Sequence, residues 1–465
     1  MTEILRKTLR DSKPARWTAL LIVAFTMFAG YYLADVMSPL EGMLDAQLHW
    51  NSDNYGFFTG AYGWFNVFLF FLIFGGIILD KIGVRFTGLT SAVVMVAGAG
   101  LKYWAISTSS LDGISWHLLF WTYPAQVWMA ALGFAIFGVG VEVAGITVSK
   151  VIVKWFQGHE LALAMGLQLS IARLGTALAL STSLPIAKAV GHVSFPILLC
   201  LIMLCIGLLA FFVYTFQDKK LDDSLAAFQS ETQAEPEEEF SFRDILFIIK
   251  NKGWWYITIL CALFYSAVFP FLKFATNLMI IKYGVAENWA GSIPGLLPFG
   301  TIILTPFFGN LYDRKGKGAS IMILGSLIII VVHFLFSLSF LSHYFVAIVL
   351  MVILGIGFSL VPSAMWPSVP KIIPERQLGT AYALIFWVQN AWALMFVPAL
   401  IGWVLNNYCI IGKLVVDGQE VTKYNYTIPM LIFTSFGVLA LLFAFLLKAE
   451  DRKKGYGLEL PNIKS

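Results

Sequence analysis

The chain has 465 residues, of which 59% are hydrophobic and 12% charged, with a mean hydropathy of +0.79 and a net charge of +4. Soluble domains carry about 25% charged residues, so this composition excludes an ordinary soluble fold and favours a polytopic membrane protein. It also excludes nucleic acid as a partner, because the basic residues form no face with interleaved aromatic residues outside the apolar segments.

Apolar runs long enough to cross a bilayer, about 20 residues each, recur along the whole chain. The first follows a basic segment and has no small-residue cleavage site, so we expect a retained helix and not a signal peptide. Because a helix satisfies its own backbone hydrogen bonds in lipid, the predicted fold class is an all-α membrane protein with twelve transmembrane helices. The predicted spans lie at roughly 17–37, 56–79, 87–108, 124–149, 161–186, 194–216, 254–280, 288–311, 319–341, 344–365, 378–405 and 428–448.

The distribution of Lys and Arg predicts the orientation of these spans. With the N-terminus placed in the cytoplasm, the cytoplasmic segments hold 24 of the 31 basic residues, the outer segments four and the spans three. This bias predicts that both termini are cytoplasmic. The short basic N-terminal tail has no acidic dileucine signal, which favours a bacterial inner membrane, with a lysosomal or plasma membrane as the alternatives.

The spans divide into two groups of six around the longest polar stretch, 217–252. This stretch contains the acidic run "QSETQAEPEEEF", which is typical of a flexible linker, and then "SFRDILFIIKNK", which predicts an amphipathic helix at the membrane surface. We therefore expect an N-terminal six-helix bundle over 1–216, a cytoplasmic linker over 217–252 and a C-terminal six-helix bundle over 253–465.

Each group carries a similar motif after its second span, "GIILDKIGVR" after span 2 and "GNLYDRKGKG" after span 8. Two glycines and one aspartate of the first copy recur 233 residues later in the second. A glycine lets another helix approach closely and an aspartate accepts hydrogen bonds from helix N-terminal amides, so we expect a gate at the inner face. The residues of this predicted gate are Gly76, Asp80, Lys81, Gly83 and Arg85 in the first copy, and Gly309, Asp313, Arg314 and Gly316 in the second.

The twelve spans, the long central loop and the repeated motif resemble the major facilitator superfamily over the whole chain. The second motif departs from this pattern after Gly316, where Lys317 and Gly318 take the places of Val84 and Arg85. The resemblance implies the major facilitator fold, in which two pseudo-symmetric six-helix bundles rock around a central site that opens alternately to each side. The chain contains no Walker A motif, which argues against ATP-driven transport.

One arginine stands alone in the fifth span, where Arg173 is the only charged residue of "LQLSIARLGTALALS". Glu142 lies 14 residues before Phe156, near the turn between spans 4 and 5, and Arg173 lies 17 residues after it. At about 1.5 Å per residue, both lie roughly 20–25 Å from the turn and therefore at similar depth. Because charges at this depth are costly, function is the default interpretation. Two interpretations remain open: a structural ion pair, or a ligand site in which Arg173 binds a carboxylate and Glu142 a cation.

Two segments carry a narrower resemblance. The stretch "KWFQGHELALAMGLQLSIARLG" (154–175), together with Glu142, and the stretch "YSAVFPFL" (265–272) resemble the lysosomal dipeptide carriers of this superfamily and their bacterial relatives. This resemblance implies that Glu142 binds the α-ammonium group of a dipeptide and Arg173 its α-carboxylate. The two ends of a dipeptide are about 5–7 Å apart, a distance that two helices around a cavity can span.

Further candidates surround this pair. Asp35 and Lys273 lie near the outer ends of spans 1 and 7, where they form an outer gate, join the site or reach the interface by snorkelling. For Lys102 we expect snorkelling to the interface. The predicted substrate-binding set also includes aromatic and amide residues at positions that can line a cavity, namely Gln168, Tyr265, Phe269, Trp387 and Asn390.

We thus expect a secondary transporter, without catalytic residues, that moves a small zwitterionic solute, dipeptides or short peptides, by alternating access. The alternatives are an organic-anion (carboxylate) carrier, a proton-coupled symporter of other small solutes, and a solute sensor. We expect a monomer without cofactor. We expect no metal site either, since the cysteines at 200, 205, 261 and 409 have no metal-ligand or CxxC spacing. In the last outer loop, "KLVVDGQEVTKY" predicts a β-hairpin that turns at Asp417–Gly418.

Overall fold

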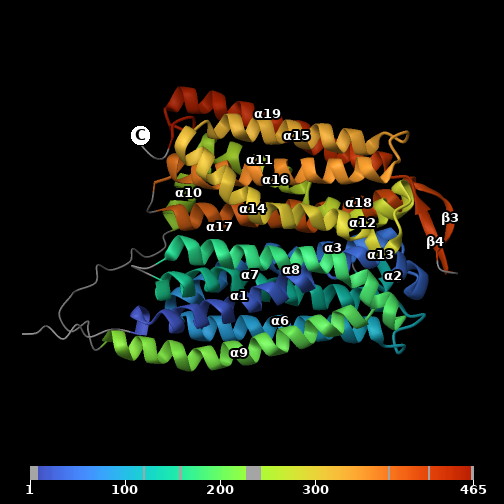
Figure 1. Ribbon diagram of the computed structural model, residues 1–465, viewed down its shortest axis with the longest axis horizontal. Coiled ribbons are helices and arrows are strands. Elements are labelled where there is room, and N and C mark those ends of the chain that lie inside the picture. The colour runs from blue at the N-terminus through green and yellow to red at the C-terminus, as the bar shows by residue number, and fades with distance from the viewer. Residues whose placement is uncertain are drawn as a thin grey trace, which may run out of the picture.

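The computed structural model describes residues 9–118, 121–156, 160–226, 242–374, 377–416 and 419–461. Its helices run side by side along the long axis of the molecule in two groups, the first half of the chain in blue to green and the second in yellow to red (Figure 1). The helices of the first half are α1 (Lys13–Asp35), α2 (Glu41–Leu48), α3 (Ser52–Gly60), α4 (Trp64–Phe68), α5 (Phe71–Ile82), α6 (Val84–Ser107), α7 (Ala125–Phe156), α8 (Leu161–Val190) and α9 (Phe195–Ala226). This arrangement confirms the predicted all-helical membrane fold.

The second half contains the helices that follow the linker, a π-helical segment and the second of two short hairpins. The helices are α10 (Phe242–Lys250), α11 (Lys252–Ser266), α12 (Phe269–Tyr283), α13 (Glu287–Ala290), α14 (Ser292–Lys315), α15 (Gly318–Ser337), α16 (Tyr344–Ile372), α17 (Leu378–Gln389), the π-helical segment Asn390–Phe396, α18 (Val397–Tyr408) and α19 (Thr427–Lys454). The strands are β1 (Ser115–Leu118) and β2 (Trp121–Pro124) in the first half, and β3 (Ile410–Val416) and β4 (Gln419–Tyr424) in the second.

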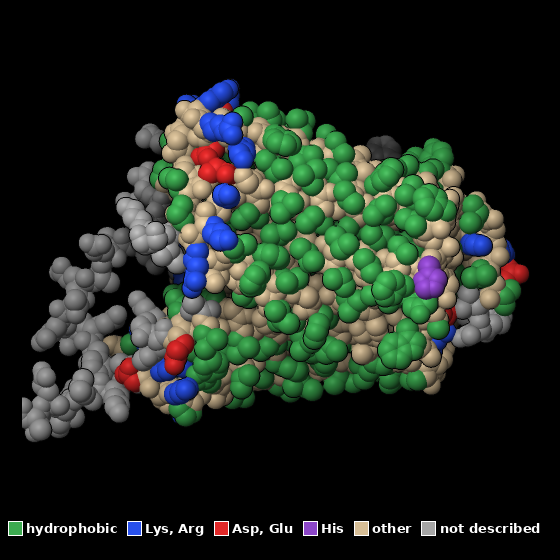
Figure 2. Space-filling view, turned by 45° about the horizontal axis from the view of Figure 1, so that its top comes forward, with side chains coloured by type: hydrophobic (Ala, Val, Ile, Leu, Met, Phe, Trp, Pro, Cys, Tyr) green, Lys and Arg blue, Asp and Glu red, His purple; other side chains and the backbone are tan. Residues whose placement is uncertain are grey.

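Among the described residues, eleven helices are long and apolar enough to cross a membrane, and a twelfth span results when the bent pair Ser52–Phe68 and Phe71–Leu79 is counted as one. Figure 2 shows the belt of hydrophobic side chains that these helices present, with Lys and Arg gathered at one end. We call this end, where α1 begins and α19 ends, the terminal face, and the opposite end, where β3 and β4 lie, the hairpin face (Figure 1). A belt between charged ends is the surface that a bilayer requires.

Three of the predicted spans are interrupted near the middle of the molecule. The second bends by 56° between α4 and α5, where Phe70 takes a φ of +54°, a conformation that bulky residues rarely adopt. The seventh divides into α11 and α12 just before Pro270, which has no N–H to continue the helical ladder. The eleventh contains the π-helical segment Asn390–Phe396, and such segments are frequent at functional sites.

The two halves meet closely toward the hairpin face. A Cβ atom on Gly56 of α3 would lie 2.8 Å from Gly402 Cα and 2.7 Å from the carbonyl oxygen of Pro398, so only glycine fits at this crossing with α18. On the same side Lys188 of α8 forms an ion pair with Glu287 of α13. These contacts close the space between the halves at this face.

The hairpin of β3 and β4 reinforces this closure. The antiparallel pairing of the two strands confirms the predicted hairpin, whose turn at Asp417–Gly418 lies outside the described residues. The Thr422 amide donates to Asp45 of α2 at 2.8 Å, and the Tyr424 hydroxyl accepts from the Ser52 amide at 3.2 Å. A segment of the second half is thereby fastened to the first. The shorter hairpin of β1 and β2 was not predicted.

The chain between the halves differs from the prediction at its beginning. Helix α9 continues to Ala226, beyond the expected end of the sixth span at 216, because Asp218 and Asp222 in this extension are paired with basic residues of α6 and α7. The acidic run 229–240 lies outside the described residues. Helix α10 forms within the predicted amphipathic segment, with Ile248 buried and Phe247 half exposed; its place at the membrane surface stays a prediction.

Candidate functional site

A cavity of about 720 Å³ lies between the two halves. Asp35 and Lys273 line its end nearer the hairpin face. Gly166, near the start of α8, and Gly309, near the end of α14, line its end nearer the terminal face. A Cβ atom on Gly166 or Gly309 would meet nothing within 4 Å, so the cavity is wide at this end. Pockets for small ligands measure about 300–1,000 Å³, and this cavity falls within that range.

The first half contributes the two charged residues on which the sequence analysis depends. Glu142 of α7 and Arg173 of α8 both line the cavity, as their equal depth predicts. The hydroxyl group of Tyr62, in the turn between α3 and α4, donates to Glu142 Oε1 at 2.7 Å. This hydrogen bond fixes the direction of the carboxylate, which remains partly exposed to the cavity.

Arg173 contacts an aromatic ring and, among the described residues, no polar partner. Its guanidinium carbon lies 5.6 Å from the ring centroid of Phe358, on α16 of the other half. Within the described part of the chain, no hydrogen bond or ion pair reaches this guanidinium, and Glu142 is not joined to it. The structural ion pair that the sequence left open is therefore not formed, and the guanidinium donors face the cavity.

The second half contributes an aromatic wall. Tyr265, Phe269 and Phe358, which we call the aromatic cluster, lie with ring centroids 4.9, 5.7 and 5.8 Å apart, and all three line the cavity. Trp366 donates from Nε1 to the Tyr265 hydroxyl at 3.3 Å and stacks on Phe386 at 4.9 Å. The cavity thus has a charged wall and an aromatic wall on opposite sides.

Toward the hairpin face, the cavity ends at an ion pair between the halves. Lys273 of α12 contacts Asp35 Oδ1 at 2.6 Å and donates to the Ala34 carbonyl oxygen at 2.7 Å, while both charged side chains are largely buried. The Tyr55 hydroxyl donates to the Lys273 backbone carbonyl at 3.0 Å. This pair lines the cavity and closes it, so the interpretation by snorkelling is wrong for both residues.

The expectation for Lys102 is also wrong. Its side chain is fully buried in the first half, donates to the Leu33 carbonyl oxygen at 3.3 Å and lies 4.5 Å from the ring centroid of Phe134. The last carbonyl groups of a helix have no partner within it. Lys102 and Lys273, one from each half, therefore cap two adjacent carbonyl groups at the end of α1, those of Leu33 and Ala34.

The structure brings most of the predicted binding residues together. Gln168 and Trp387 do not line the cavity; Trp387 donates instead from Nε1 to the Val67 carbonyl oxygen at 3.0 Å and stacks on Phe70 at 5.7 Å. The predicted residues that line it are Asp35, Glu142, Arg173, Tyr265, Phe269, Lys273 and Asn390.

Sequence reasoning missed Phe358 and Phe386. A signal for Phe358 was present, since Phe358, Pro362 and Trp366 follow one another at four-residue spacing and so share one face of α16. All three line the cavity.

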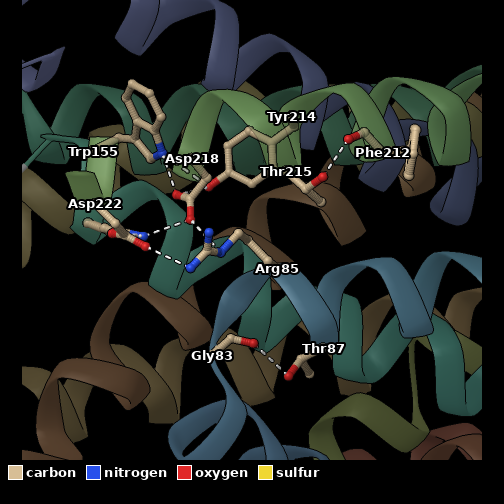
Figure 3. Close-up of polar contacts among 10 residues, drawn as sticks. Gly83, Arg85, Thr87, Trp155, Phe212, Tyr214, Thr215, Asp218 and Asp222 are labelled. Atoms are coloured by element: carbon tan, nitrogen blue, oxygen red, sulfur yellow. Dashed lines mark hydrogen bonds and ion pairs between the residues drawn. The ribbon is translucent and has the colours of Figure 1, made fainter. Parts of the chain in front are cut away.

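The first gate motif is held within its own half (Figure 3). Arg85 contacts Asp222 at 3.1 Å and Asp218 at 3.7 Å, and Lys154 contacts both acids at 2.6 and 2.7 Å. Asp218 is fully buried and also accepts from Trp155 and Tyr214. A Cβ on Gly76 would meet nothing within 4 Å, and the Asp80 side chain lies outside the described residues.

The second gate motif is covered by the segment that follows α19. Gly316 has a φ of +67°, and the amides after it donate to that segment, Lys317 to Glu459 at 3.0 Å and Gly318 to Leu458 at 2.9 Å. The Glu459 carboxylate accepts from the amide and the hydroxyl of Ser320 at 2.9 and 2.8 Å. This motif is therefore also bound within its own half.

Among the described residues, no group of three or more His, Cys, Asp or Glu side chains is placed to hold a metal ion. The family model of the Major Facilitator Superfamily matches residues 20–398.

Two curated relatives are similar in sequence. The chain is 26% identical over 402 residues to the lysosomal dipeptide transporter MFSD1 of Homo sapiens. The aligned region covers 84% of this chain and 80% of that protein. It is 29% identical over 278 residues to the protein of the same name from Gallus gallus, over 57% of this chain and 59% of that protein.

Solved structures are similar in fold. A peptide transporter POT superposes with a TM-score of 0.67 at 14% identity, over 95% of each chain. An inward-facing, unoccupied bacterial homologue of the human lysosomal transporter Spinster gives 0.66 at 13% identity, over 98% of this chain and 99% of that one. At these identities the likeness concerns the fold alone.

Proposed function

The chain belongs to the major facilitator superfamily of membrane transporters, and we propose that it is a secondary transporter of dipeptides or short peptides. Its relatives are transporters and not enzymes. In this proposal Glu142 binds the α-ammonium group of the peptide and Arg173 its α-carboxylate. The substrate named for MFSD1, a dipeptide, supports the choice of substrate class.

The observation that carries the proposal is the unpaired state of Arg173. An arginine inside a membrane is costly, and such residues almost always have a partner or face a water-filled cavity. Here the guanidinium faces the cavity, and the Glu142 carboxylate lines the same cavity. A carboxylate fits its two parallel N–H donors, which gives both strength and orientation. A zwitterion satisfies both charges at once.

The contacts between the halves support alternating access. The hairpin face is closed by the Asp35–Lys273 and Lys188–Glu287 ion pairs, while the cavity extends toward the terminal face. We propose that the terminal face is cytoplasmic, because Lys and Arg gather there (Figure 2). The state described is then inward-facing. Protease accessibility of the α19 end in intact cells tests the orientation.

Uptake of labelled Ala-Ala into proteoliposomes, together with counterflow, tests the function. We expect Arg173→Ala to weaken peptide binding about tenfold to a hundredfold, since hydrogen bonds to charged groups contribute about 1.5–3 kcal/mol. Gln168→Ala, on the same helix but outside the cavity lining, is the matched control and should transport normally. Equal uptake by wild type and by Arg173→Ala would overturn the proposed site.

Chemically blocked peptides assign the two ends. N-acetyl-Ala-Ala lacks the ammonium group, and Ala-Ala amide lacks the carboxylate. If Glu142 binds the ammonium group, Glu142→Gln weakens Ala-Ala but leaves the already poor binding of N-acetyl-Ala-Ala unchanged. Arg173→Ala should show the complementary pattern with the amide.

A second candidate function is an organic-anion carrier. One feature favours it: among the residues that the structure describes, Glu142 has a polar partner in Tyr62 and Arg173 has none. In that case succinate competes for uptake as well as Ala-Ala does, and Glu142→Gln leaves the competition unchanged.

A further inference from the structure

The charges that line the cavity are distributed unequally between its walls. The first half supplies Asp35, Glu142 and Arg173, whereas the lining of the second half carries one charged residue, Lys273, which is already paired with Asp35. A peptide whose two ends bind Glu142 and Arg173 is therefore held against the first half. Its side chains then face the second half.

The contact between Arg173 and Phe358 indicates which side chain meets the aromatic cluster. The guanidinium carbon lies 5.6 Å from the ring centroid of Phe358. A carboxylate bound to this guanidinium belongs to the last residue of the peptide, and the side chain of that residue branches from the adjoining Cα. The last residue, and not the first, is thus placed beside Phe358 and its neighbours Tyr265 and Phe269.

The aromatic cluster is built to receive an apolar group. Phe358 meets Tyr265 at 88° and Phe269 at 71°, edge-to-face geometries that aromatic rings prefer. The polar group of Tyr265 is already engaged, because its hydroxyl accepts from Trp366 Nε1 at 3.3 Å. Behind the cluster, Phe264 stacks parallel to Phe358 at 6.1 Å and is fully buried, so it supports the ring without reaching the cavity.

We propose that Tyr265, Phe269 and Phe358 form the pocket for the side chain of the last residue of the peptide, and that they select aromatic and large apolar side chains there. This inference rests on the proposed function. Contacts between aromatic rings contribute binding free energy beyond that of burying the ring. A peptide that ends in Phe should therefore bind at least about tenfold more tightly than one that ends in Ala.

The pair Ala-Phe and Phe-Ala provides the test, because the two peptides have the same composition and charge and differ only in order. Purified protein in proteoliposomes takes up labelled Ala-Ala while each peptide competes. We expect Ala-Phe to compete at about a tenfold lower concentration than Phe-Ala. Phe358→Leu keeps an apolar side chain but removes the ring, and it should abolish the difference between the two peptides. The readout is the ratio of the competing concentrations of Ala-Phe and Phe-Ala within the variant, which does not depend on its level of Ala-Ala uptake. Phe264→Leu is the matched control and should preserve the difference.

Two outcomes overturn the inference while leaving the proposed function intact. One is equal or stronger competition by Phe-Ala; the other is an equal loss of all three peptides in Phe358→Leu, which would mean that the ring only supports the fold. If none of the peptides binds and Arg173→Lys changes nothing, the proposed function fails and the inference fails with it. Phe269→Leu, which removes another ring of the aromatic cluster, serves as a second variant should Phe358→Leu not fold, and it should likewise reduce the difference between the two peptides.

Discussion

Replacing Asp35 with Asn removes one charge from the ion pair that closes the cavity toward the hairpin face. Lys273 then keeps its hydrogen bond to the Ala34 carbonyl oxygen at 2.7 Å but loses the carboxylate at 2.6 Å. Because Asp35 belongs to the first half and Lys273 to the second, the pair exists only while the halves are together on this side. We expect the variant to favour the state that is open at the hairpin face.

The size of this shift follows from the burial of the pair. The side chains of Asp35 and Lys273 are 16% and 14% exposed. At an effective dielectric constant of about 20, unit charges 2.6 Å apart attract by about 6 kcal/mol, partly offset by the desolvation of both groups. Removing one partner of a buried pair costs about 3–5 kcal/mol. We expect both groups to be hydrated in the open state, so this cost falls on the closed state and changes the ratio of the two states by about 10²- to 10⁴-fold.

Labelling of a single cysteine measures the shift. Thr176 lines the cavity and is 5% exposed, so Thr176→Cys should react slowly with a membrane-impermeant maleimide added from the hairpin side. In Asp35→Asn the rate should rise at least tenfold. Glu420→Gln is the control on the same face. Its ion pair with Lys413 is about two-thirds exposed, so it contributes about 0–1 kcal/mol and should leave the rate unchanged.

The exchanged variant, Asp35→Lys with Lys273→Asp, should return the labelling rate toward that of wild type. If Asp35→Asn and Lys273→Met both label as slowly as wild type, the ion pair does not hold the halves together and the reasoning is refuted.

Three further predictions concern packing and stability. Gly56→Ala places a Cβ 2.7 Å from the Pro398 carbonyl oxygen, so the hairpin face should fail to close and Thr176→Cys should label faster, whereas Gly100→Ala, with nothing within 4 Å, should have no effect. Asp218→Asn breaks a fully buried network and should cost about 3 kcal/mol in a thermal unfolding assay, while Asp222→Asn, which is 37% exposed, should cost less than about 1 kcal/mol. Leu458→Ala should cost about 2–4 kcal/mol because Leu458 is fully buried against the second gate motif, whereas Leu460→Ala, at 64% exposure, should be nearly neutral; equal melting temperatures would contradict the role of this segment.

The depth of the two central charges in the membrane could be predicted from the sequence, because it depends only on the number of helical residues between each charge and the turn. Glu142 and Arg173 flank one short turn, and the constant rise of a helix places them at the same depth. Membrane burial then restricts where such side chains can point. The repeated motif and the apolar runs are likewise local patterns, and they determine the span count and the division into halves.

The remaining features depend on contacts between segments far apart in the sequence. The pairing of Asp35 with Lys273 joins residues 238 positions apart. Their places near the outer ends of spans 1 and 7 left a gate, a binding role and snorkelling equally open, and only the packing of the two halves decides among them. The break at Phe70 occurs without glycine or proline, and there the stacking of Phe70 on Trp387 and the hydrogen bond from Trp387 to Val67 hold an unusual backbone. Local propensity cannot reveal a conformation that tertiary contacts impose.

At the terminal face, each half has contacts that hold its gate motif against its other helices. Ion pairs do so in the first half, and hydrogen bonds do so in the second. In the first half, acids in the extension of α9 bind Arg85 of the motif and Lys154 at the end of α7. In the second, the segment after α19 binds the amides of the motif turn, and its Gly457 and Leu460 carbonyl oxygens accept from Lys371 at the end of α16.

In each half, therefore, the end of the last helix or the segment that follows it binds both the motif and a lysine on the fourth span. Helices bound in this way move together, since bending one away would expose the buried Asp218 or Leu458. In the proposed alternating access, the motion that opens and closes the cavity is then expected between the halves. The contacts that cross between the halves, and that such a motion would change, include the Gly56–Gly402 crossing, the Asp35–Lys273 and Lys188–Glu287 ion pairs and the stack of Phe70 on Trp387.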